Sequence, residues 1–500
     1  MELALSDMIP EIDFFAENTL GIQTLELMRR AGAAVARAVR ELTSCGGKVL
    51  ILAGGGNNGG DGYAAACELL ADYSVTVLDV FGAGQKSEAG RHFLAEYIRL
   101  GGVIALDGTD RLIKEADSLV DAIFGTGFRG EIPEALIPII NAVNQSRAAK
   151  VAVDIPIGVD ADTGELRGHY ISVDRTVALS YIKPGLVSFP AVEAVGKLSL
   201  DTLGIDGDRV GEAFSFKNRL TDEKWAAKAL PKRDKNGNKG SFGRALLAVG
   251  SDRYRGAAHL AAEACLRAGI GYATFAGDAS LAAELRLRLP ELLFAEVDNY
   301  SERELTELSK KHTVTLIGCG SGCTAEVARA AAALLSEEGG TLILDADALN
   351  ALAAYGGTER IKASARKVIL TPHPLELSRL SGLDVSYIQA HRLPVARAFA
   401  KENNCTLLLK GAATVITDGD EVFINSTGST ALSKAGSGDV LAGLIAALAA
   451  NIPSPTVAAA LAAYLHGAAG DTLAEALSPF GVIPSDLPKQ IAYILAGLTK

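Results

Sequence analysis

The chain has 500 residues, of which 49% are hydrophobic and 21% are charged, and 53 are glycine. This length exceeds one ordinary core and predicts two or three domains of about 150 residues each. The composition is typical of a soluble α/β protein and argues against disorder, and the formal net charge of −11 argues against nucleic acid as a partner.

Nothing in the sequence predicts export or membrane insertion. Residues 1–15 lack the basic and apolar segments of a signal peptide, and no uninterrupted apolar run reaches membrane-spanning length. Only Cys319 and Cys323 lie close together among the six cysteines, and no second pair completes a zinc site. We expect reduced thiols in a cytoplasmic protein without a membrane partner.

Apolar strands alternate with helical patterns in the first half of the chain. We expect strands at residues 48–54, 75–81, 118–124, 150–156 and 175–182, with helices between them at 63–73 and 132–145. Continuous apolar strands that alternate with helices predict a parallel sheet covered on both faces. The first domain is therefore expected to be a Rossmann-like three-layer α/β/α unit.

Three polar loops follow strands in this half: GGGNNGGDG at 54–62, DAIFGTGFRGE at 121–131 and DIPIGVDADTG at 154–164. The carboxyl ends of parallel strands face one edge, so the loops should converge on a ligand. Glycines let the backbone approach a pyrophosphate, and a helix start offers free N–H donors. For the first loop alone, a tight strand-to-helix turn is the alternative. Asp154 is the best candidate acid or base, whereas Asp160 and Asp162 are expected only to shape the turn.

The domain boundary is expected near residues 215–233. A basic, glycine-containing loop at 231–241 follows, and it is interpreted either as a linker or as a mobile lip over an anionic ligand. A second α/β series begins at 243–251 and continues through strands within 312–322, 341–350, 367–377 and 405–417. The chain is expected to be helical from about Gly438 to its end.

KAGSGDVLAG at 434–443 is the most informative stretch of this second half. The backbone of Gly436, Ser437 and Gly438 can form an anion hole at a helix start, which a transferring phosphoryl group needs. Asp439 beside it can take a proton from a hydroxyl nucleophile. The alternative is that Asp439 is only a helix N-cap.

Other segments support a nucleotide site. LLLKGAATVI at 407–416 is predicted as strand, glycine turn and strand, suited to holding adenine and ribose. His373 lies between two prolines at a strand end, although a lone histidine is more often structural. GCGSG at 318–322 is another glycine-rich loop, and LILDADALN at 342–350 ends a strand with two carboxylates.

The first-half loops, together with YIKPGL at 181–186, resemble the YjeF N-terminal family over residues 1–215. The resemblance implies a domain that epimerises the hydroxyl-bearing carbon of hydrated NADH and NADPH. It implies Asp154 as the catalytic contact near the reacting ring and Lys183 as a phosphate-side residue. The other substrate-binding residues that it implies are Asn57, Asn58, Gly59, Gly60, Asp61, Gly125, Thr126, Gly127, Phe128, Arg129, Gly130 and Glu131.

The same resemblance implies a potassium ion, K+, held by Asn58 and Asp121 and at the position of Ile157. The family usually has Ser or Thr at that position, whereas Ile157 offers only its backbone carbonyl. We therefore expect weaker potassium binding with an unchanged fold.

The second half, residues 216–500, resembles the ribokinase-like superfamily, and most closely its ADP- or ATP-dependent NAD(P)H-hydrate dehydratases. Residues 239–274 match the opening of that family closely. The resemblance implies that Asp439, Ala257 and Gly322 contact the hydrated dinucleotide, where Ala258 and Gly320 are the neighbouring alternatives. It implies the same for His373, Pro374, Leu375, Glu376, Leu377, Ser378 and Arg379. The implied adenine-nucleotide residues are Lys410, Gly411, Ala412, Ala413, Thr414, Ser429, Thr430, Ala431, Leu432, Ser433, Lys434, Ala435, Gly436, Ser437 and Gly438.

The implied chemistry is a repair reaction. Asp439 is expected to deprotonate the hydroxyl of the S hydrate, which takes phosphate from ADP, with Mg2+ as the expected companion ion; expulsion of phosphate then restores NADH or NADPH and leaves AMP. The alternatives are a ribokinase-type small-molecule kinase and a non-catalytic N-terminal binding module, as in scaffolding proteins. A homo-oligomer is expected, while the preferences for NADH or NADPH hydrate and for ADP or ATP stay open.

Overall fold

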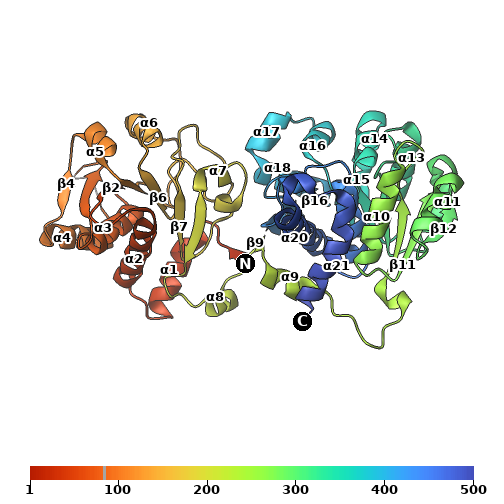
Figure 1. Ribbon diagram of the computed structural model, residues 1–500, viewed down its shortest axis with the longest axis horizontal. Coiled ribbons are helices and arrows are strands. Elements are labelled where there is room, and N and C mark those ends of the chain that lie inside the picture. Colours follow the sequence, from red (N-terminus) through yellow and green to blue (C-terminus); the bar gives the residue numbers. More distant parts are fainter. Residues whose placement is uncertain (83–85, 500) are drawn as a thin grey trace. The chain divides into compact units, whose positions relative to one another are not determined.

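The computed structural model describes residues 1–82 and 86–499 and divides into two compact units (Figure 1). One unit comprises residues 2–218. The other comprises residues 219–500 together with Met1, whose amino group donates to the carbonyl of Leu220 at 2.8 Å. This division lies a few residues beyond the predicted boundary at residue 215.

The N-terminal unit is built on a sheet of parallel strands in the order β4-β3-β2-β5-β6-β7-β8. After the short β1 (Glu2–Leu3), its strands are β2 (Lys48–Ala53), β3 (Ser74–Asp79), β4 (Val103–Ala105), β5 (Ser118–Ala122), β6 (Ala149–Val153), β7 (Arg175–Leu179) and β8 (Lys197–Asp201). Several strands end earlier than predicted because their last residues turn into the loops. The predicted parallel α/β unit is confirmed.

Helices cover both faces of this sheet. They are α1 (Met8–Asn18), α2 (Thr24–Leu42), α3 (Asn57–Leu69), α4 (Glu88–Arg99), α5 (Thr109–Glu115), α6 (Ile137–Gln145), α7 (Val192–Val195) and α8 (Gly207–Ala213), with 3-10 turns η1 (Glu134–Leu136) and η2 (Pro184–Val187). Alternate residues of β2 enter different apolar clusters: Val49 and Ile51 pack with α1 to α4, whereas Leu50 and Leu52 pack with α5 and α6. The sheet is thus the middle of three layers.

The C-terminal unit contains a mixed sheet in which the order β9-β18-β17-β16-β15-β14-β13-β10-β11-β12 is continuous. Neighbours from β12 to β16 are parallel, and β16, β17 and β18 are antiparallel. The strands are β9 (Asn218–Thr221), β10 (Arg244–Ala248), β11 (Tyr272–Gly277), β12 (Leu293–Glu296), β13 (Val314–Ile317), β14 (Thr341–Leu344), β15 (Val368–Leu370), β16 (Thr406–Leu409), β17 (Val415–Thr417) and β18 (Val422–Asn425). The strand-turn-strand prediction for 407–416 is confirmed by the β16–β17 hairpin.

The helices of this unit include the buried core helix α19 (Ser437–Ala449). The others are α9 (Glu223–Ala229), α10 (Arg255–Arg267), α11 (Ala279–Arg288), α12 (Glu302–Ser309), α13 (Ala325–Ser336), α14 (Asp347–Tyr355), α15 (Glu359–Ala363), α16 (Pro374–Ser381), α17 (Val385–Ala390), α18 (Arg392–Asn403), α20 (Pro455–Gly481) and α21 (Leu487–Leu498), with η3 (Lys239–Phe242), η4 (Asp298–Tyr300), η5 (Thr430–Leu432) and η6 (Pro484–Asp486). A Cβ on Gly443 of α19 would lie 2.0 Å from the carbonyl oxygen of Ala261 in α10. Only glycine permits this close packing, which sets how near α19 lies to α10.

The basic loop that follows Pro231 lies at the amino ends of the strands. The N–H of Gly271, just before β11, donates to the carbonyl of Phe242 at 2.9 Å. Ligands in parallel sheets bind at the opposite, carboxyl edge, so this position favours a linker over a lip. Across the described residues, the structure holds no helix with the length and apolar character needed to cross a membrane.

Candidate active sites

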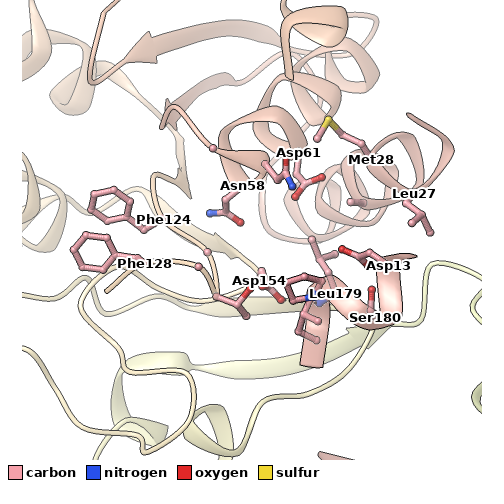
Figure 2. Close-up of a pocket in the computed structure, with 18 of the residues that line it drawn as sticks. Asp13, Leu27, Met28, Asn58, Asp61, Phe124, Phe128, Asp154, Leu179 and Ser180 are labelled. Carbon is pink, nitrogen blue, oxygen red and sulfur yellow. Dashed lines mark hydrogen bonds between the residues drawn. The ribbon is translucent and has the colours of Figure 1, made fainter. Parts of the chain in front are cut away.

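The glycine-rich loops of the N-terminal unit meet at the carboxyl edge of its sheet, around a pocket of about 850 Å³ (Figure 2). The ends of β2, β5, β6 and β7 form one part of the wall, and helices α1 and α2 form another. Its lining includes the predicted site residues Asn57, Asn58, Asp61, Gly125, Thr126, Gly127, Phe128 and Asp154.

Gly59 and Gly60 do not line the pocket but lie buried in the first turns of α3. A Cβ on Gly59 would come 2.1 Å from the carbonyl oxygen of Gly54, and one on Gly60 would come 2.6 Å from the Met28 methyl. These glycines therefore let α3 begin directly against the end of β2 and against α2. The helix therefore starts at Asn57, earlier than predicted. Its first-turn glycines are needed for close packing and not for a flexible loop.

Asp154 has a strained backbone and a buried cationic partner. Its φ is 64°, in the left-handed region that residues other than glycine rarely adopt. Its Oδ1 accepts from the Lys183 ammonium at 2.5 Å and from the Leu179 N–H at 3.1 Å. Lys183 also donates to the Leu179 carbonyl at 2.9 Å. The ammonium of Lys183 is thus paired with Asp154 inside the pocket.

Asp61 enters the pocket from α3. Burial raises the pKa of Asp61 well above its usual range, and the nearby negative charge of Asp154 raises it further. A buried carboxyl without a cationic partner costs folding free energy, so such groups concentrate at functional sites.

Sequence reasoning missed two further ionisable residues of this pocket, Asp13 and Lys86. Asp13 lies on α1 without any motif around it. Lys86 forms a buried ion pair with Asp79, the last residue of β3, at 2.7 Å. Neither has a recognisable spacing in the sequence, because each reaches the pocket only through the packing of its element.

The residues predicted to hold potassium lie at the end of β5 and the start of α3. Asp121 is buried, and its two oxygens accept from the N–H groups of Ile157 at 2.7 Å and Ile123 at 3.2 Å. Burial raises the pKa of Asp121 to about 6, although these two hydrogen bonds lower it. The buried Asn58 Nδ2 has no hydrogen-bond partner among the described residues. The Ile157 side chain packs in the apolar cluster beneath the loop, and its carbonyl accepts from Ile171 N–H at 3.1 Å.

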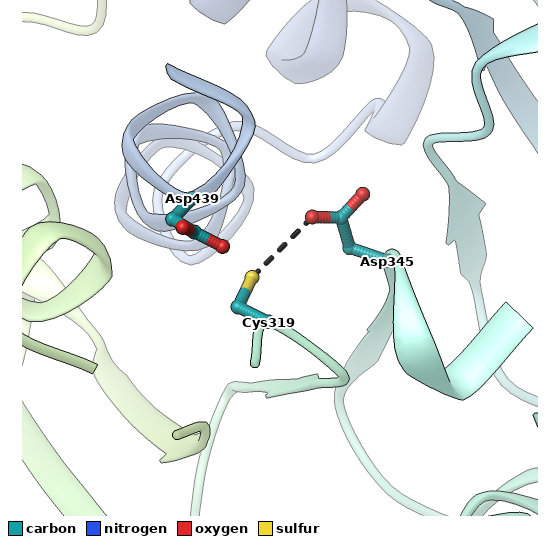
Figure 3. Close-up of side chains that lie close together, drawn as sticks. All are labelled: Cys319, Asp345 and Asp439. Carbon is teal, nitrogen blue, oxygen red and sulfur yellow. Dashed lines mark hydrogen bonds between the residues drawn. The ribbon is translucent and has the colours of Figure 1, made fainter. Parts of the chain in front are cut away.

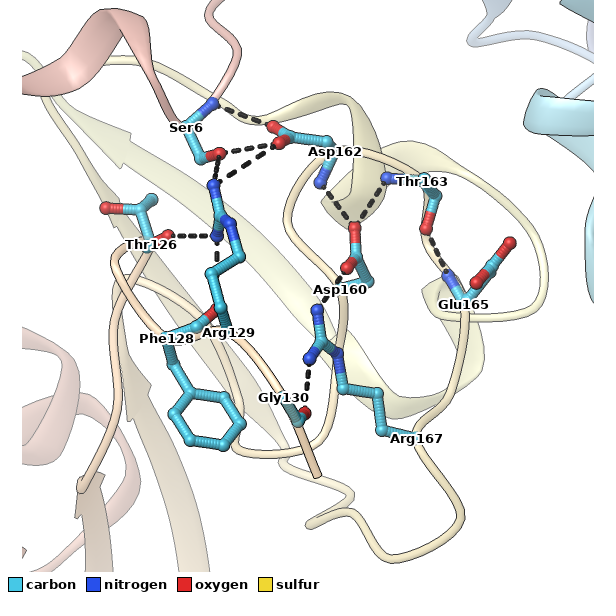
Figure 4. A network of polar contacts seen from close by, with 10 residues as sticks. All are labelled: Ser6, Thr126, Phe128, Arg129, Gly130, Asp160, Asp162, Thr163, Glu165 and Arg167. Atoms are coloured by element: carbon cyan, nitrogen blue, oxygen red, sulfur yellow. Dashed lines mark hydrogen bonds and ion pairs between the residues drawn. The ribbon is translucent and has the colours of Figure 1, made fainter. Parts of the chain in front are cut away.

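Asp160 and Asp162 organise the loop that follows Asp154 (Figure 4). Asp160 Oδ1 accepts from the N–H groups of Asp162 and Thr163, each at 3.0 Å, and its other oxygen pairs with Arg167. Asp162 accepts from both the N–H and the hydroxyl of Ser6. Both aspartates therefore carry structural contacts, as the sequence favoured.

The predicted residues Arg129, Gly130 and Glu131 lie outside the pocket lining. Arg129 donates to the carbonyls of Thr126 and Phe128 at 2.8 and 3.1 Å and to Ser6 (Figure 4). Arg129 thus closes its own loop and joins it to the segment that precedes α1.

The second site lies at the carboxyl ends of β13 and β14, facing the start of α19. Side-chain atoms of Cys319, Asp345 and Asp439 lie within 4.8 Å of one another (Figure 3). Asp345 is buried; its Oδ1 accepts from Lys410 and from Thr371, each at 2.6 Å, and its Oδ2 accepts from Cys319 at 3.4 Å. The carboxylates of β14 and the 318–322 loop stand out in the sequence, but no motif there assigns Asp345 or Cys319 to the site.

Asp439 is the third residue of α19, and it does not cap the helix. The N-cap is Gly436, whose φ of 104° is in the left-handed region, and no side chain caps the helix start. Burial raises the pKa of Asp439 to about 6, and the neighbouring charge of Asp345 raises it further. The N-cap alternative is therefore wrong, and a partly buried carboxylate with a pKa near neutrality suits a general base.

Lys410 brings a positive charge to the same place. Burial alone would lower the pKa of Lys410, but the charges of Asp345 and Glu376 outweigh this, and the pKa is raised. A Cβ on Gly438 would lie 3.5 Å from Lys410 Nζ, so the ammonium stands beside the start of α19. An ammonium next to helix N–H donors is a setting for a phosphate group.

The remaining predicted nucleotide residues lie in two turns. In the turn between β16 and β17, Gly411 has a φ of 139° and Thr414 donates to its carbonyl at 2.8 Å. The segment 429–435 contains η5, in which Ala431 is buried. Lys434 donates to the carbonyls of Phe480 and Val482, so its contacts are structural.

His373 begins α16 as part of a capping box. Its Nδ1 accepts from Glu376 N–H at 3.2 Å, while the Glu376 carboxylate accepts from His373 N–H at 2.8 Å. Arg379 donates to Asn350 at 2.5 Å, and Leu377 is fully buried. His373 is thus rigidly displayed, whereas Leu377 faces the core.

The alanine and glycine residues implied to contact the hydrated dinucleotide lie close together in the structure. A Cβ on Gly320 would meet the Ala257 methyl at 2.6 Å, while the neighbouring Ala258 is fully buried. Gly322 N–H donates to Asp347 at 2.8 Å. Ala257 and the 318–322 loop therefore face the same space above β13.

These two units define a class of protein: a two-domain α/β enzyme with a pocket of about 850 Å³ at the sheet edge of one half and a buried cluster of Asp345, Lys410 and Asp439 at a glycine-lined helix start in the other. Residues 24–185 match the protein family described as "YjeF-related protein N-terminus". Residues 245–492 match the family described as "NAD(P)H-hydrate dehydratase". The chain belongs to the family of bifunctional NAD(P)H-hydrate repair enzymes.

Relatives of full length support this membership. The chain is 35% identical to the bifunctional NAD(P)H-hydrate repair enzyme Nnr of Moorella thermoacetica, over 100% of this chain and 97% of that protein. It is 33% identical to the Escherichia coli protein of the same description, over 94% of this chain and 90% of that protein.

Solved structures match the C-terminal unit. The ADP/ATP-dependent NAD(P)H-hydrate dehydratase of Bacillus subtilis, co-crystallised with ATP and Mg2+, is 30% identical with a TM-score of 0.51, covering 55% of this chain and 97% of that one. A ribokinase-like superfamily protein of Enterococcus faecalis is 27% identical with a TM-score of 0.50, covering 57% and 99%. The predicted ribokinase-like fold of this unit is confirmed.

Proposed function

We propose that this chain repairs hydrated NADH and NADPH in two steps. The N-terminal unit interconverts the R and S hydrates, and the C-terminal unit uses ADP or ATP to dehydrate the S hydrate, releasing phosphate and, from ADP, AMP. The observation that carries the proposal is Asp439, a partly buried carboxylate with a pKa near 6 beside a glycine-lined helix start.

In the dehydration step, Asp439 takes the proton of the substrate hydroxyl next to the ring nitrogen. The hydroxyl oxygen then accepts the terminal phosphoryl group of the nucleotide. The lone pair of the ring nitrogen forms a C=N bond as phosphate leaves, and loss of a ring proton restores the dihydronicotinamide. Phosphorylation is needed because hydroxide is a poor leaving group.

The surrounding residues stabilise the charge that develops during transfer. The N–H groups at the start of α19 and the Lys410 ammonium supply positive potential to the phosphoryl oxygens. Asp345 holds Lys410 in place at 2.6 Å, and Thr371 in turn fixes Asp345. Removal of water from this site strengthens each of these interactions.

The donor set near Asp439 fits Mg2+ through oxygen ligands. The carboxylate of Asp345 is the kind of hard oxygen ligand that Mg2+ prefers, together with nucleotide phosphates. Burial raises the pKa of Cys319 well above its usual range, so Cys319 stays a neutral thiol and is not a Mg2+ ligand. Bound there, the ion would neutralise phosphate charge.

In the epimerisation step, Asp154 is the residue that transfers a proton to or from the oxygen on the reacting carbon. Lys183 and the Leu179 N–H hold one of its oxygens, which leaves the other for substrate. The oxygens of Asn58 and Asp121 fit a potassium ion, since Asp121 is a buried carboxylate without a cationic partner among the described residues. Such an ion would balance this charge, with no side-chain ligand from Ile157.

The test is to mix the protein with the S hydrate of NADH and ADP and to follow the return of dihydronicotinamide absorbance. We expect NADH, phosphate and AMP in equal amounts. The R hydrate alone should be converted too, at a rate set by the N-terminal unit. A phosphorylated alcohol that accumulates without NADH would instead establish the kinase alternative.

The non-catalytic alternative for the N-terminal unit is disfavoured by its retained Asp154–Lys183 pair, which a purely structural domain does not need. A homo-oligomer and a cytoplasmic location stay predictions.

A further inference from the structure

Asp13 faces the pocket of the N-terminal unit from a different element than Asp154. Figure 2 shows Asp13 on α1, Asp61 on α3 and Asp154 beyond the end of β6, all bordering the same space. Asp13 has no hydrogen-bond or ion-pair partner among the described residues. The family match begins at residue 24, so Asp13 lies outside it.

Helix α1 holds Asp13 in a fixed position. Ile12 and Ala16 are fully buried, and the Phe15 ring contacts the Phe214 ring edge to face, with centroids 5.7 Å apart. Just before the helix, the N–H of Ser6 donates to Asp162 at 2.7 Å. The carboxyl group is therefore presented to the pocket by a packed helix.

Burial, more than the charges around it, keeps Asp13 partly protonated. Burial raises the pKa of Asp13 to about 6; the Lys183 ammonium lowers it and the Asp154 carboxylate raises it. The third ionisable neighbour is Asp61 of α3, whose own pKa is raised by burial and by the charges of Asp154 and Asp13. Asp154 forms an ion pair with Lys183 at 2.5 Å.

We propose that Asp13 is a second catalytic acid–base residue of the epimerase, acting on the opposite face of the hydrated ring from Asp154. This inference rests on the proposed function. Inversion by loss and re-addition of the hydroxyl requires a group to leave from one face of the carbon and another to arrive on the other face, which two proton-transferring groups on different elements can serve.

Protonated Asp13 gives its proton to the substrate hydroxyl, the C–O bond breaks, and water leaves while the ring-nitrogen lone pair forms a C=N bond. A water molecule then adds to the same carbon from the other face, the C=N electrons return to nitrogen, and Asp154 takes the released proton. The reverse direction exchanges the two roles, so the active form carries one proton on the pair.

The test compares Asp13→Asn with Glu11→Gln, an exposed carboxylate on the same helix. We expect Asp13→Asn to lower epimerase kcat by about 100-fold or more, with KM and S-hydrate dehydration unchanged, and Glu11→Gln to match the unaltered protein. In H2¹⁸O, each inversion by the unaltered protein should introduce one solvent oxygen. For the unaltered protein, kcat/KM should fall as the pH rises through about 6, because Asp13 then loses the proton that it donates. The Asp13→Asn variant should lack this fall.

Three results would overturn the inference: normal epimerisation by Asp13→Asn, inversion without solvent oxygen, or loss of the pH 6 limb in Asp61→Asn alone. If Asp13→Asn proves unstable, the pH profile and isotope result of the unaltered protein, with Asp13→Glu, decide the question. An unaltered protein that interconverts no hydrates would instead refute the proposed function.

Discussion

Replacing Asp439 by Asn separates its chemistry from its effect on stability. The amide keeps the shape of the side chain but cannot accept the substrate proton. We expect dehydration to slow by about 10²–10⁴-fold, while nucleotide binding and epimerisation are retained.

The same substitution should stabilise the fold increasingly as the pH rises above the ordinary pKa of an aspartate. In the folded protein the pKa of Asp439 is raised from 3.8 to about 6. The unfolded chain therefore loses its proton first as pH rises, and stability falls between these two values. This penalty amounts to about 1.5 kcal/mol at pH 5 and about 3 kcal/mol at pH 8. The uncharged amide of the variant avoids the penalty, so its advantage in unfolding free energy should grow with pH.

The assay is denaturant unfolding at pH 5 and pH 8, alongside single-turnover dehydration. Glu338→Gln, at an exposed position just after α13, is the matched control and should change neither measurement appreciably. An Asp439→Asn variant that dehydrates at the normal rate would refute the base assignment. A variant that is less stable at both pH values would refute the argument from burial.

Three further outcomes are expected. Asp154→Asn should abolish epimerisation and spare dehydration of the S hydrate; normal conversion of the R hydrate by that variant would exclude Asp154 as the essential group. Ile157→Ser should lower the half-saturating potassium concentration of epimerisation, yet cost about 2–4 kcal/mol of folding free energy, because Ile157 is only 1% exposed; identical potassium titrations would contradict the ligand argument. A fragment of residues 216–500 should fold and dehydrate the S hydrate alone, and an insoluble or inactive fragment would show that the units depend on each other.

The fold class and the reactive loops could be predicted from the sequence, because their signals are local. Apolar runs of strand length alternate with helical patterns, which specifies a layered α/β structure. The glycine-rich stretches at 54–62 and 434–443 each lie between a strand and a helix. This local pattern predicts ligand-binding loops without knowledge of how the elements pack. Asp439 lies within the second of these stretches, and Asp154 opens the polar loop that follows β6, so both could be predicted from the sequence.

Tertiary structure alone decided which side chains meet. Lys183 reaches Asp154 from beyond β7, and Lys410 reaches Asp345 from the end of β16. Both pairings depend on strand order and register, which no local spacing encodes. Asp13 shows this most clearly: an isolated aspartate on an ordinary helix enters the pocket only because the apolar face of α1, with Ile12 and Ala16, packs on the core and turns the carboxyl group inward. Local patterns thus determine the elements, whereas long-range packing determines the chemistry between them.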